Sequence, residues 1–205
     1  MPTRRLGANI LCTRHNGALS RLDTLAGFFF RVLYGYQLAQ ADPASPARLG
    51  ASQIAVFDGS DLERWLLKVL LGGVAAHAFS HGGTTVTSIR TDANHANLIE
   101  TLFRGADWPK GWGFHIGATR GAELKELAPI SLQTASGPDG SAWKLTVTVG
   151  VVELQVCLGR PDKLGPDLVA RPGGIVLDQR GGRGHRLTAL AWPDSGHRFI
   201  SLTRR

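Results

Sequence analysis

The sequence predicts an α+β protein in which an N-terminal helical layer of about three helices packs on a C-terminal antiparallel sheet of hairpins. Two patterns support this fold class. In the first half of the chain, apolar residues recur at the i, i+3, i+4, i+7 spacing of helices. From Trp112 onward apolar and polar residues alternate, and clusters of glycine and proline separate the alternating stretches. We therefore expect residues 1–107 to form a helical part and 108–205 a β part of one compact unit.

A short strand is expected at residues 10–12, and a first helix should follow it and end near Ala41. Its start can be capped by Asn16, or by Ser20 together with Asp23 in a capping box. The run 28–30 consists of three phenylalanines, which is too wide for one apolar stripe, so both flanks of the helix should be covered. The apolar positions at helical spacing are Leu22, Leu25, Ala26, Phe29, Val32, Leu33 and Tyr36.

A second helix should follow a short strand or buried connector at residues 54–57. Ser60 and Glu63 have the spacing of a capping box at its start. His77 extends the apolar face of this helix, His81 follows at i+4, and two glycines then end the helix. Histidines at this spacing can share a metal ion, or they can cap the helix, where an imidazole meets the free carbonyls.

A third helix is predicted from about Asn94 to Phe103, followed by Gly105 as its C-terminal stop. Leu98, Ile99, Leu102 and Phe103 are its expected inward residues. The segment 108–115 then combines two tryptophans and a phenylalanine with Lys110. Such aromatics either stack nucleic-acid bases or, as is more common, fill a seam between parts of the fold.

The β part is expected to contain two hairpins. The first joins 130–133 to 143–149 across a glycine- and proline-rich turn, and its second strand continues beyond a bulge at Gly150. The second joins 186–192 to 197–202. Between them, the basic glycine loop 181–186 can cradle phosphate or serve as a plain connection.

Positive charge is concentrated at the two ends of the chain. The net charge is +7; residues 1–31 carry five basic and one acidic side chain, and residues 171–205 carry seven and two. Two basic ends can converge on one phosphate-binding surface, or they can reflect a solvated basic surface alone. The candidate nucleic-acid-binding residues are Arg4, Arg5, Arg14, Arg21, Arg180, Arg183 and Arg186.

Composition indicates a cytoplasmic protein that does not enter the membrane. The most apolar window, 65–79, contains Lys68 and His77 and is shorter than the about 20 apolar residues that a membrane helix needs. No signal peptide is recognised. The two cysteines are separated by 144 intervening residues, which favours a reducing compartment over a disulfide framework.

The strongest candidate metal ligands are Cys12 and His15, because side chains at Cys-x-x-His spacing can coordinate one metal ion. The alternative is a small buried cysteine ahead of a helix. The run Leu-Cys-x-x-His-Asn-x-x-Leu-Ser-x-Leu-Asp at residues 11–23, followed by Ala-Gly-x-Phe-Phe, resembles the closing segment of bacterial HNH-like (ββα-metal) proteins.

The resemblance covers roughly residues 8–30 and implies that Cys12 and His15 match the second half of a structural zinc site. Asn16 would match the metal-facing position that opens the family's final helix. The family's first zinc pair and catalytic histidine precede this segment, and only eleven residues precede Cys12 here. The resemblance therefore implies the closing half of the unit without the usual nuclease mechanism.

These features predict a nucleic-acid-associated, HNH-related protein that binds DNA or RNA and has no nuclease activity of its own. One alternative is an interaction subunit that docks on a partner protein through the face at residues 28–30 and through its tryptophans. Another is a metal-dependent nuclease completed by another chain. Zinc or another divalent metal is the possible cofactor, with Cys12, His15, His77 and His81 as the expected ligands.

Overall fold

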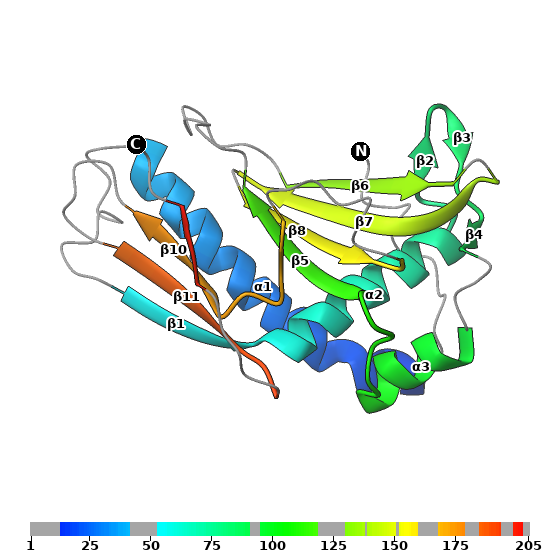
Figure 1. Ribbon diagram of the computed structural model, residues 1–205, viewed down its shortest axis with the longest axis horizontal. Helices are drawn as coiled ribbons and strands as arrows, with labels where there is room; N and C mark the ends of the chain where they lie inside the picture. The colour runs from blue at the N-terminus through cyan, green and yellow to red at the C-terminus, as the bar shows by residue number, and fades with distance from the viewer. Residues whose placement is uncertain are drawn as a thin grey trace.

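The computed structural model describes residues 13–41, 53–90, 95–118, 130–137, 139–150, 152–159, 168–178, 185–193 and 199–202. Within these residues the α+β class is confirmed, with helices α1 (Thr13–Ala41), α2 (Gly59–Ala75) and α3 (His95–Arg104) packed on sheets (Figure 1). None of these helices is both long and apolar enough to cross a membrane.

The larger of two main sheets has the strand order β4-β7-β8-β5-β9, with β6 also paired to β7. The smaller has the order β1-β11-β10-β12, and β2 and β3 form a separate short hairpin. The strands are β1 (Gln53–Asp58), β2 (Ser80–His81), β3 (Thr84–Thr85), β4 (Ser88–Ile89), β5 (Gly113–Ala118), β6 (Ser131–Ser136), β7 (Ser141–Val149), β8 (Val152–Cys157), β9 (Val169–Ala170), β10 (Gly174–Asp178), β11 (His185–Ala191) and β12 (Phe199–Leu202).

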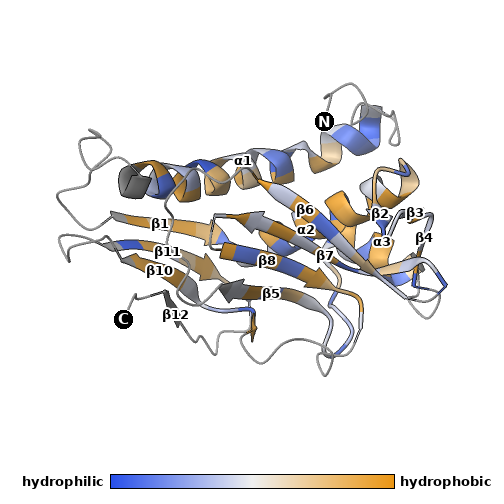
Figure 2. Ribbon diagram, turned by 90° about the horizontal axis from the view of Figure 1, so that it is seen from above, coloured by the Kyte–Doolittle hydropathy of each residue, from blue (hydrophilic) through white to orange (hydrophobic). Residues whose placement is uncertain are grey.

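The two main sheets lie end to end beneath α1, which runs along both (Figure 2). The core fills the space between the helices and the apolar faces of the sheets. Phe29 and Leu33 of α1, Leu66 of α2 and Phe114 of β5 are fully buried in one cluster. The three phenylalanines of α1 diverge: Phe29 enters the core, Phe30 packs on Trp65, and Phe28 contacts Phe57 with half of its surface exposed.

The predicted hairpin between β11 and β12 is wrong. β11 pairs antiparallel with β10 on one side and parallel with β1 on the other, whereas β12 pairs parallel with β10. Alternating apolar residues mark both segments as strands, but this period does not specify a partner. The hairpin of β6 and β7 is confirmed.

The bulge predicted at Gly150 is also wrong, because the chain turns there. β7 ends at Val149, which pairs with Val152 at the start of β8, so two residues join the strands. Gly150 has φ +61°, a left-handed conformation that a two-residue hairpin loop requires and that glycine adopts without strain. The turn therefore explains the shift in apolar phase.

Both predicted helix starts need correction. α1 begins at Thr13, so Asn16 and Ser20 lie inside it, and the Ser20 hydroxyl donates to the carbonyl of Gly17. At the start of α2 the cap is Asp58, whose carboxylate accepts a hydrogen bond from the Asp61 N–H. Asp58 precedes the helix with extended backbone angles, as a cap requires, whereas Ser60 and Glu63 are already helical.

The far end of α2 and the inward face of α3 also differ from expectation. α2 ends at Ala75, so His77 and His81 do not share a helical face: His77 follows the helix at φ +52°, and His81 lies in β2. In α3, Leu98 and Leu102 are buried but Ile99 is about half exposed. Gly105 ends α3 at φ +69°, and its N–H donates to the Thr101 carbonyl, which confirms the predicted stop.

Candidate functional site

Three arginines lie along one exposed side of α1. Successive residues of a helix are rotated by about 100°, so Arg14, Arg21 and Arg31 fall within about 100° of one another. All three side chains are exposed, and they span about 25 Å of the helix. Phe28 and Gly35 point to the same side.

A fourth arginine reaches this side of α1 from the C-terminal part of the chain. Nη1 of Arg186, in β11, donates a hydrogen bond of 2.9 Å to the main-chain carbonyl of Val32. The guanidinium lies over Gly35, where an added Cβ would be 3.1 Å from Nη1. We call Arg14, Arg21, Arg31 and Arg186 the arginine face.

The environment of Arg186 leaves its charge poorly compensated. Among the described residues, no group accepts a hydrogen bond from its buried Nε and no carboxylate forms an ion pair with it. Burial lowers the pKa of Arg186, because removal from water disfavours the charged form. An arginine pKa starts so high that the group remains a cation at neutral pH.

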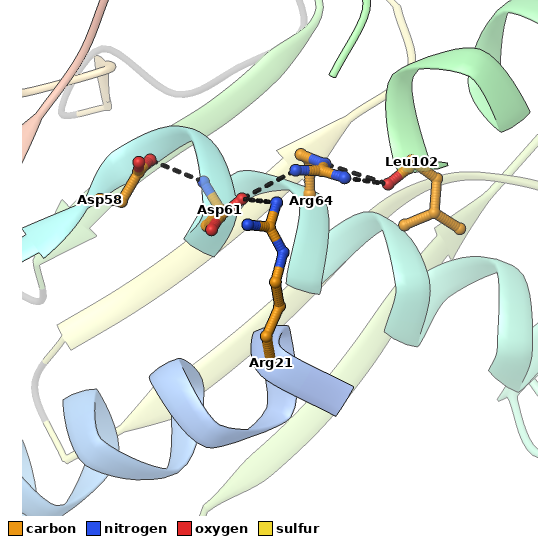
Figure 3. Close-up of polar contacts among 5 residues, drawn as sticks. All are labelled: Arg21, Asp58, Asp61, Arg64 and Leu102. Atoms are coloured by element: carbon orange, nitrogen blue, oxygen red, sulfur yellow. Dashed lines mark hydrogen bonds and ion pairs between the residues drawn. The ribbon is translucent and has the colours of Figure 1, made fainter. Parts of the chain in front are cut away.

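Arg21 is held by a network that also joins the three helices (Figure 3). Its Nη2 lies 3.2 Å from Oδ1 of Asp61, and Nη1 of Arg64 lies 2.8 Å from the same oxygen. Arg64 in turn donates through Nε and Nη2 to the Leu102 carbonyl in α3. The carboxylate of Asp61 is shared by two guanidiniums, and the Arg21 side chain remains 64% exposed.

The acidic residue of α1 points elsewhere. Asp23 is two residues from Arg21 and is therefore rotated by about 200° away from it. Its carboxylate pairs with Lys68 of α2 at 2.5 Å. The arginine face consequently carries no acidic side chain from α1 itself.

A groove of about 520 Å³ opens beside the arginine face, between α1 and the edge strand β1. Its walls are mostly apolar, with Arg31 and Arg186 as the two cations. The guanidinium of Arg31 lies 5.8 Å from the centre of the Phe28 ring. The residues that line the groove are Phe28, Arg31, Val32, Gly35, Ile54, Ala55, Arg186 and Leu187.

The expected metal ligands are only partly described. In the described ranges, no three side chains of His, Cys, Asp or Glu lie close enough together to hold a metal ion, so His15, His77 and His81 form no such group. His15 lies in the first turn of α1, and its ring packs edge-on against Phe103 of α3 at 5.3 Å. Cys12, the remaining expected ligand, lies outside the described residues.

Three of the expected nucleic-acid-binding residues, Arg14, Arg21 and Arg186, lie along one side of α1, and Arg31, which was not among those expected, lies on the same side. Helical spacing alone could have found Arg31, since it lies ten residues after Arg21 on the same side. The remaining four, Arg4, Arg5, Arg180 and Arg183, and the glycine loop up to residue 184 lie outside the described residues.

A second polar cluster, centred on Glu63, was also missed. Glu63 is 3% exposed; its carboxylate accepts from the Phe114 N–H at 2.6 Å and from Arg171 Nε at 3.0 Å. Burial raises the pKa of Glu63 above its ordinary 4.5, and the nearby Arg171 only partly offsets this. The signal was available, because Glu63 lies at i−3, i−4 and i−7 from three buried leucines of α2, Leu66, Leu67 and Leu70.

Two further reactive groups are buried in the larger sheet. Burial lowers the pKa of His115, whose Nδ1 lies 3.1 Å from the Gly113 carbonyl, so that the imidazole is favoured in its neutral form. Burial also raises the pKa of the Cys157 thiol to about 12. Both therefore belong to the packed interior, whereas Trp108 and Trp112 are partly buried and pack against the core.

Comparison with known proteins identifies no relative: no family model, no curated protein and no solved structure matches the chain.

Proposed function

We propose that this protein binds nucleic acid through its arginine face, as an HNH-related protein. The observation that carries the proposal is the contact between Arg186 and Val32, two residues 154 positions apart. This contact adds an arginine of the C-terminal part of the chain to the row on α1. Four guanidiniums then follow one side of a long helix, the arrangement expected of a surface that tracks a phosphate backbone.

Arginine suits this role because its planar guanidinium donates two parallel hydrogen bonds to a phosphate. Arg21 and Arg64 share the single carboxylate of Asp61, so Arg21 has donors to spare for an incoming phosphate. Arg186 presents a cation without a described acidic partner. Guanidinium groups bind phosphate but activate no water, so the proposal extends to binding and assigns no cleavage step.

The test is fluorescence anisotropy with a labelled 20-nucleotide DNA or RNA, measured over a series of salt concentrations. We expect binding at low salt that weakens steadily as salt rises, because bound cations displace counterions from the phosphates. The variant Arg14→Gln/Arg31→Gln should bind at least about tenfold more weakly than the wild type at low salt.

The matched control is Lys144→Gln, which removes a positive charge from β7. Lys144 pairs in register with Cys157, whereas its neighbour Leu145 points into the core, so Lys144 lies on the sheet face away from the helices. Binding by this variant should equal that of the wild type. Absence of binding at low salt, or equal losses in both variants, would contradict the proposal.

A second candidate function, docking on a partner protein, is favoured by the outer face of the smaller sheet. Ile54 and Val56 of the edge strand β1 are 69% and 68% exposed, and they pair in register with Leu187 and Ala189 on the same face. Exposed apolar patches of this kind mark interaction sites. If a second copy is the partner, light scattering should show a dimer that Val56→Lys dissociates; a monomer at all concentrations would exclude a second copy.

A further inference from the structure

We propose that the groove between α1 and β1 holds one unstacked base of a single-stranded nucleic acid, with the base ring against Phe28 and the flanking phosphates on Arg31 and Arg186. This inference rests on the proposed function and names the form of nucleic acid that the arginine face selects.

The shape and chemistry of the groove support a flat, apolar group beside an anion. Its apolar walls come from Phe28, Val32, Ile54, Ala55 and Leu187. Phe28 is 51% exposed although it is a large aromatic side chain, and its ring contacts Phe57 at 5.4 Å, which holds it in place. A ring fixed in this way offers a stacking surface for a base, and every base has the π-face that such stacking needs.

The two arginines of the groove are placed for the phosphates on either side of that base. Arg31 already lies close to the Phe28 ring, so a phosphate next to the stacked base falls within its reach. Arg186 lines the groove from β11, with its guanidinium over Gly35, which follows Phe28 by about two helical turns. A phosphate oxygen that enters the groove can accept a hydrogen bond from this guanidinium and compensate its charge, because no carboxylate of the described residues forms an ion pair with it.

A duplex fits this groove poorly. Its bases are stacked inside, and it presents phosphates and polar base edges to a protein, neither of which fills an apolar groove. Single-strand binding combines a positively charged track with aromatic side chains, and both lie here within one helix side and its adjacent groove.

The test compares three labelled ligands by anisotropy at fixed salt: a 12-nucleotide single strand, the duplex of the same length, and an abasic strand that keeps the phosphates but lacks bases. We expect the single strand to bind at least about 5-fold more tightly than the abasic strand, the effect expected for one stacked base. Phe28→Leu, which keeps an apolar side chain but removes the ring, should abolish this difference.

Tyr34→Leu is the matched control, because Tyr34 is an exposed aromatic of α1 that does not line the groove. It should behave as the wild type. Equal binding of all three ligands, with losses confined to the arginine variants, would overturn the groove assignment but leave the proposed function intact. Binding of none of them would overturn both.

Displacement of the single strand by polyglutamate at equal charge concentration would also overturn the groove assignment, because it would indicate an acidic peptide as the ligand in place of a base.

Discussion

Gly35 of α1 and Arg186 of β11 form a matched pair, in which the missing side chain of one makes room for the guanidinium of the other. A Cβ at Gly35 would lie 3.1 Å from Nη1 of Arg186, which is tighter than an ordinary van der Waals contact. The same nitrogen donates to the Val32 carbonyl. A glycine inside a helix costs stability, and here that cost is offset by the closer approach of the arginine.

Substitution of glycines in α1 tests this pairing. Gly27 has open space around its Cβ position, so Gly27→Ala should raise the free energy of unfolding by about 0.5–1 kcal/mol through helix propensity alone. Gly35→Ala should raise the free energy of unfolding by about 1 kcal/mol less than Gly27→Ala does, because Arg186 must shift and its hydrogen bond to Val32 is strained. Urea unfolding of both variants measures the difference, and equal gains would show that Arg186 does not depend on the glycine.

The ion pair between Glu63 and Arg171 should matter for stability in a pH-dependent way. Arg171→Met leaves the buried Glu63 carboxylate with only the Phe114 N–H, so we expect a loss of about 3 kcal/mol at pH 7. Burial already raises the pKa of Glu63 above 4.5, and loss of the guanidinium should raise it further. The folded state then binds the proton more tightly than the unfolded state, so the deficit should shrink as the pH falls from 7 toward 4.5.

The control for this pH dependence is the double variant Glu63→Gln/Arg171→Met, which has no titrating group at position 63. Its stability relative to the wild type should not recover on acidification in the way that Arg171→Met does. Urea midpoints at pH 7 and pH 5 provide the comparison. A constant deficit of Arg171→Met across this range would show that Glu63 does not titrate there.

The thiol of Cys157 should be inert in the folded protein. Burial raises its pKa to about 12, and the thiolate is the reactive form, so alkylating reagents should not modify it at pH 8. In a Cys12→Ser variant, which leaves Cys157 as the remaining cysteine, we expect no reaction under native conditions and one equivalent after denaturation. Rapid native reaction would mean that this part of the larger sheet opens readily.

Asp61 should weaken nucleic-acid binding, because it neutralises part of the charge of Arg21. Asp61→Asn removes that charge and should tighten binding a fewfold at low salt, and the gain should fade as salt rises. The control is Asp23→Asn, which frees Lys68 on the other flank of α1 and should have a smaller effect. Anisotropy titrations at two salt concentrations measure both, and equal effects would mean that only net charge matters.

Local patterns were sufficient to predict much of the fold. Helical spacing identified α1, α2 and α3, and alternation with turn residues identified the hairpin of β6 and β7. The same patterns could not assign partners across long separations: β1 pairs with β11 although more than 120 residues separate them, and nothing in either strand's period specifies that.

The candidate site was harder to predict from the sequence, for the same reason. The arginines of α1 share a side by helical geometry, which the sequence contains. The placement of Arg186 against Val32 depends instead on how β11 enters the smaller sheet. For Glu63, a local motif predicted the wrong role. Its position three residues after Ser60 matches a capping box, but its side chain is buried, where it contacts Arg171 and the Phe114 N–H.

The most direct test of the arginine face is the slope of log affinity against log salt for single substitutions. Each of the single variants Arg14→Gln, Arg31→Gln and Arg186→Gln should reduce the magnitude of this negative slope by about 0.7 for a single-stranded oligonucleotide, the value for one lost phosphate contact. The thermal transition of each variant checks that it folds. Lys144→Gln should leave the slope unchanged. If the slope of Arg186→Gln equals that of the wild type while the α1 variants differ, the C-terminal arginine is not part of the surface. If none of the three differs, the arginine face does not bind nucleic acid.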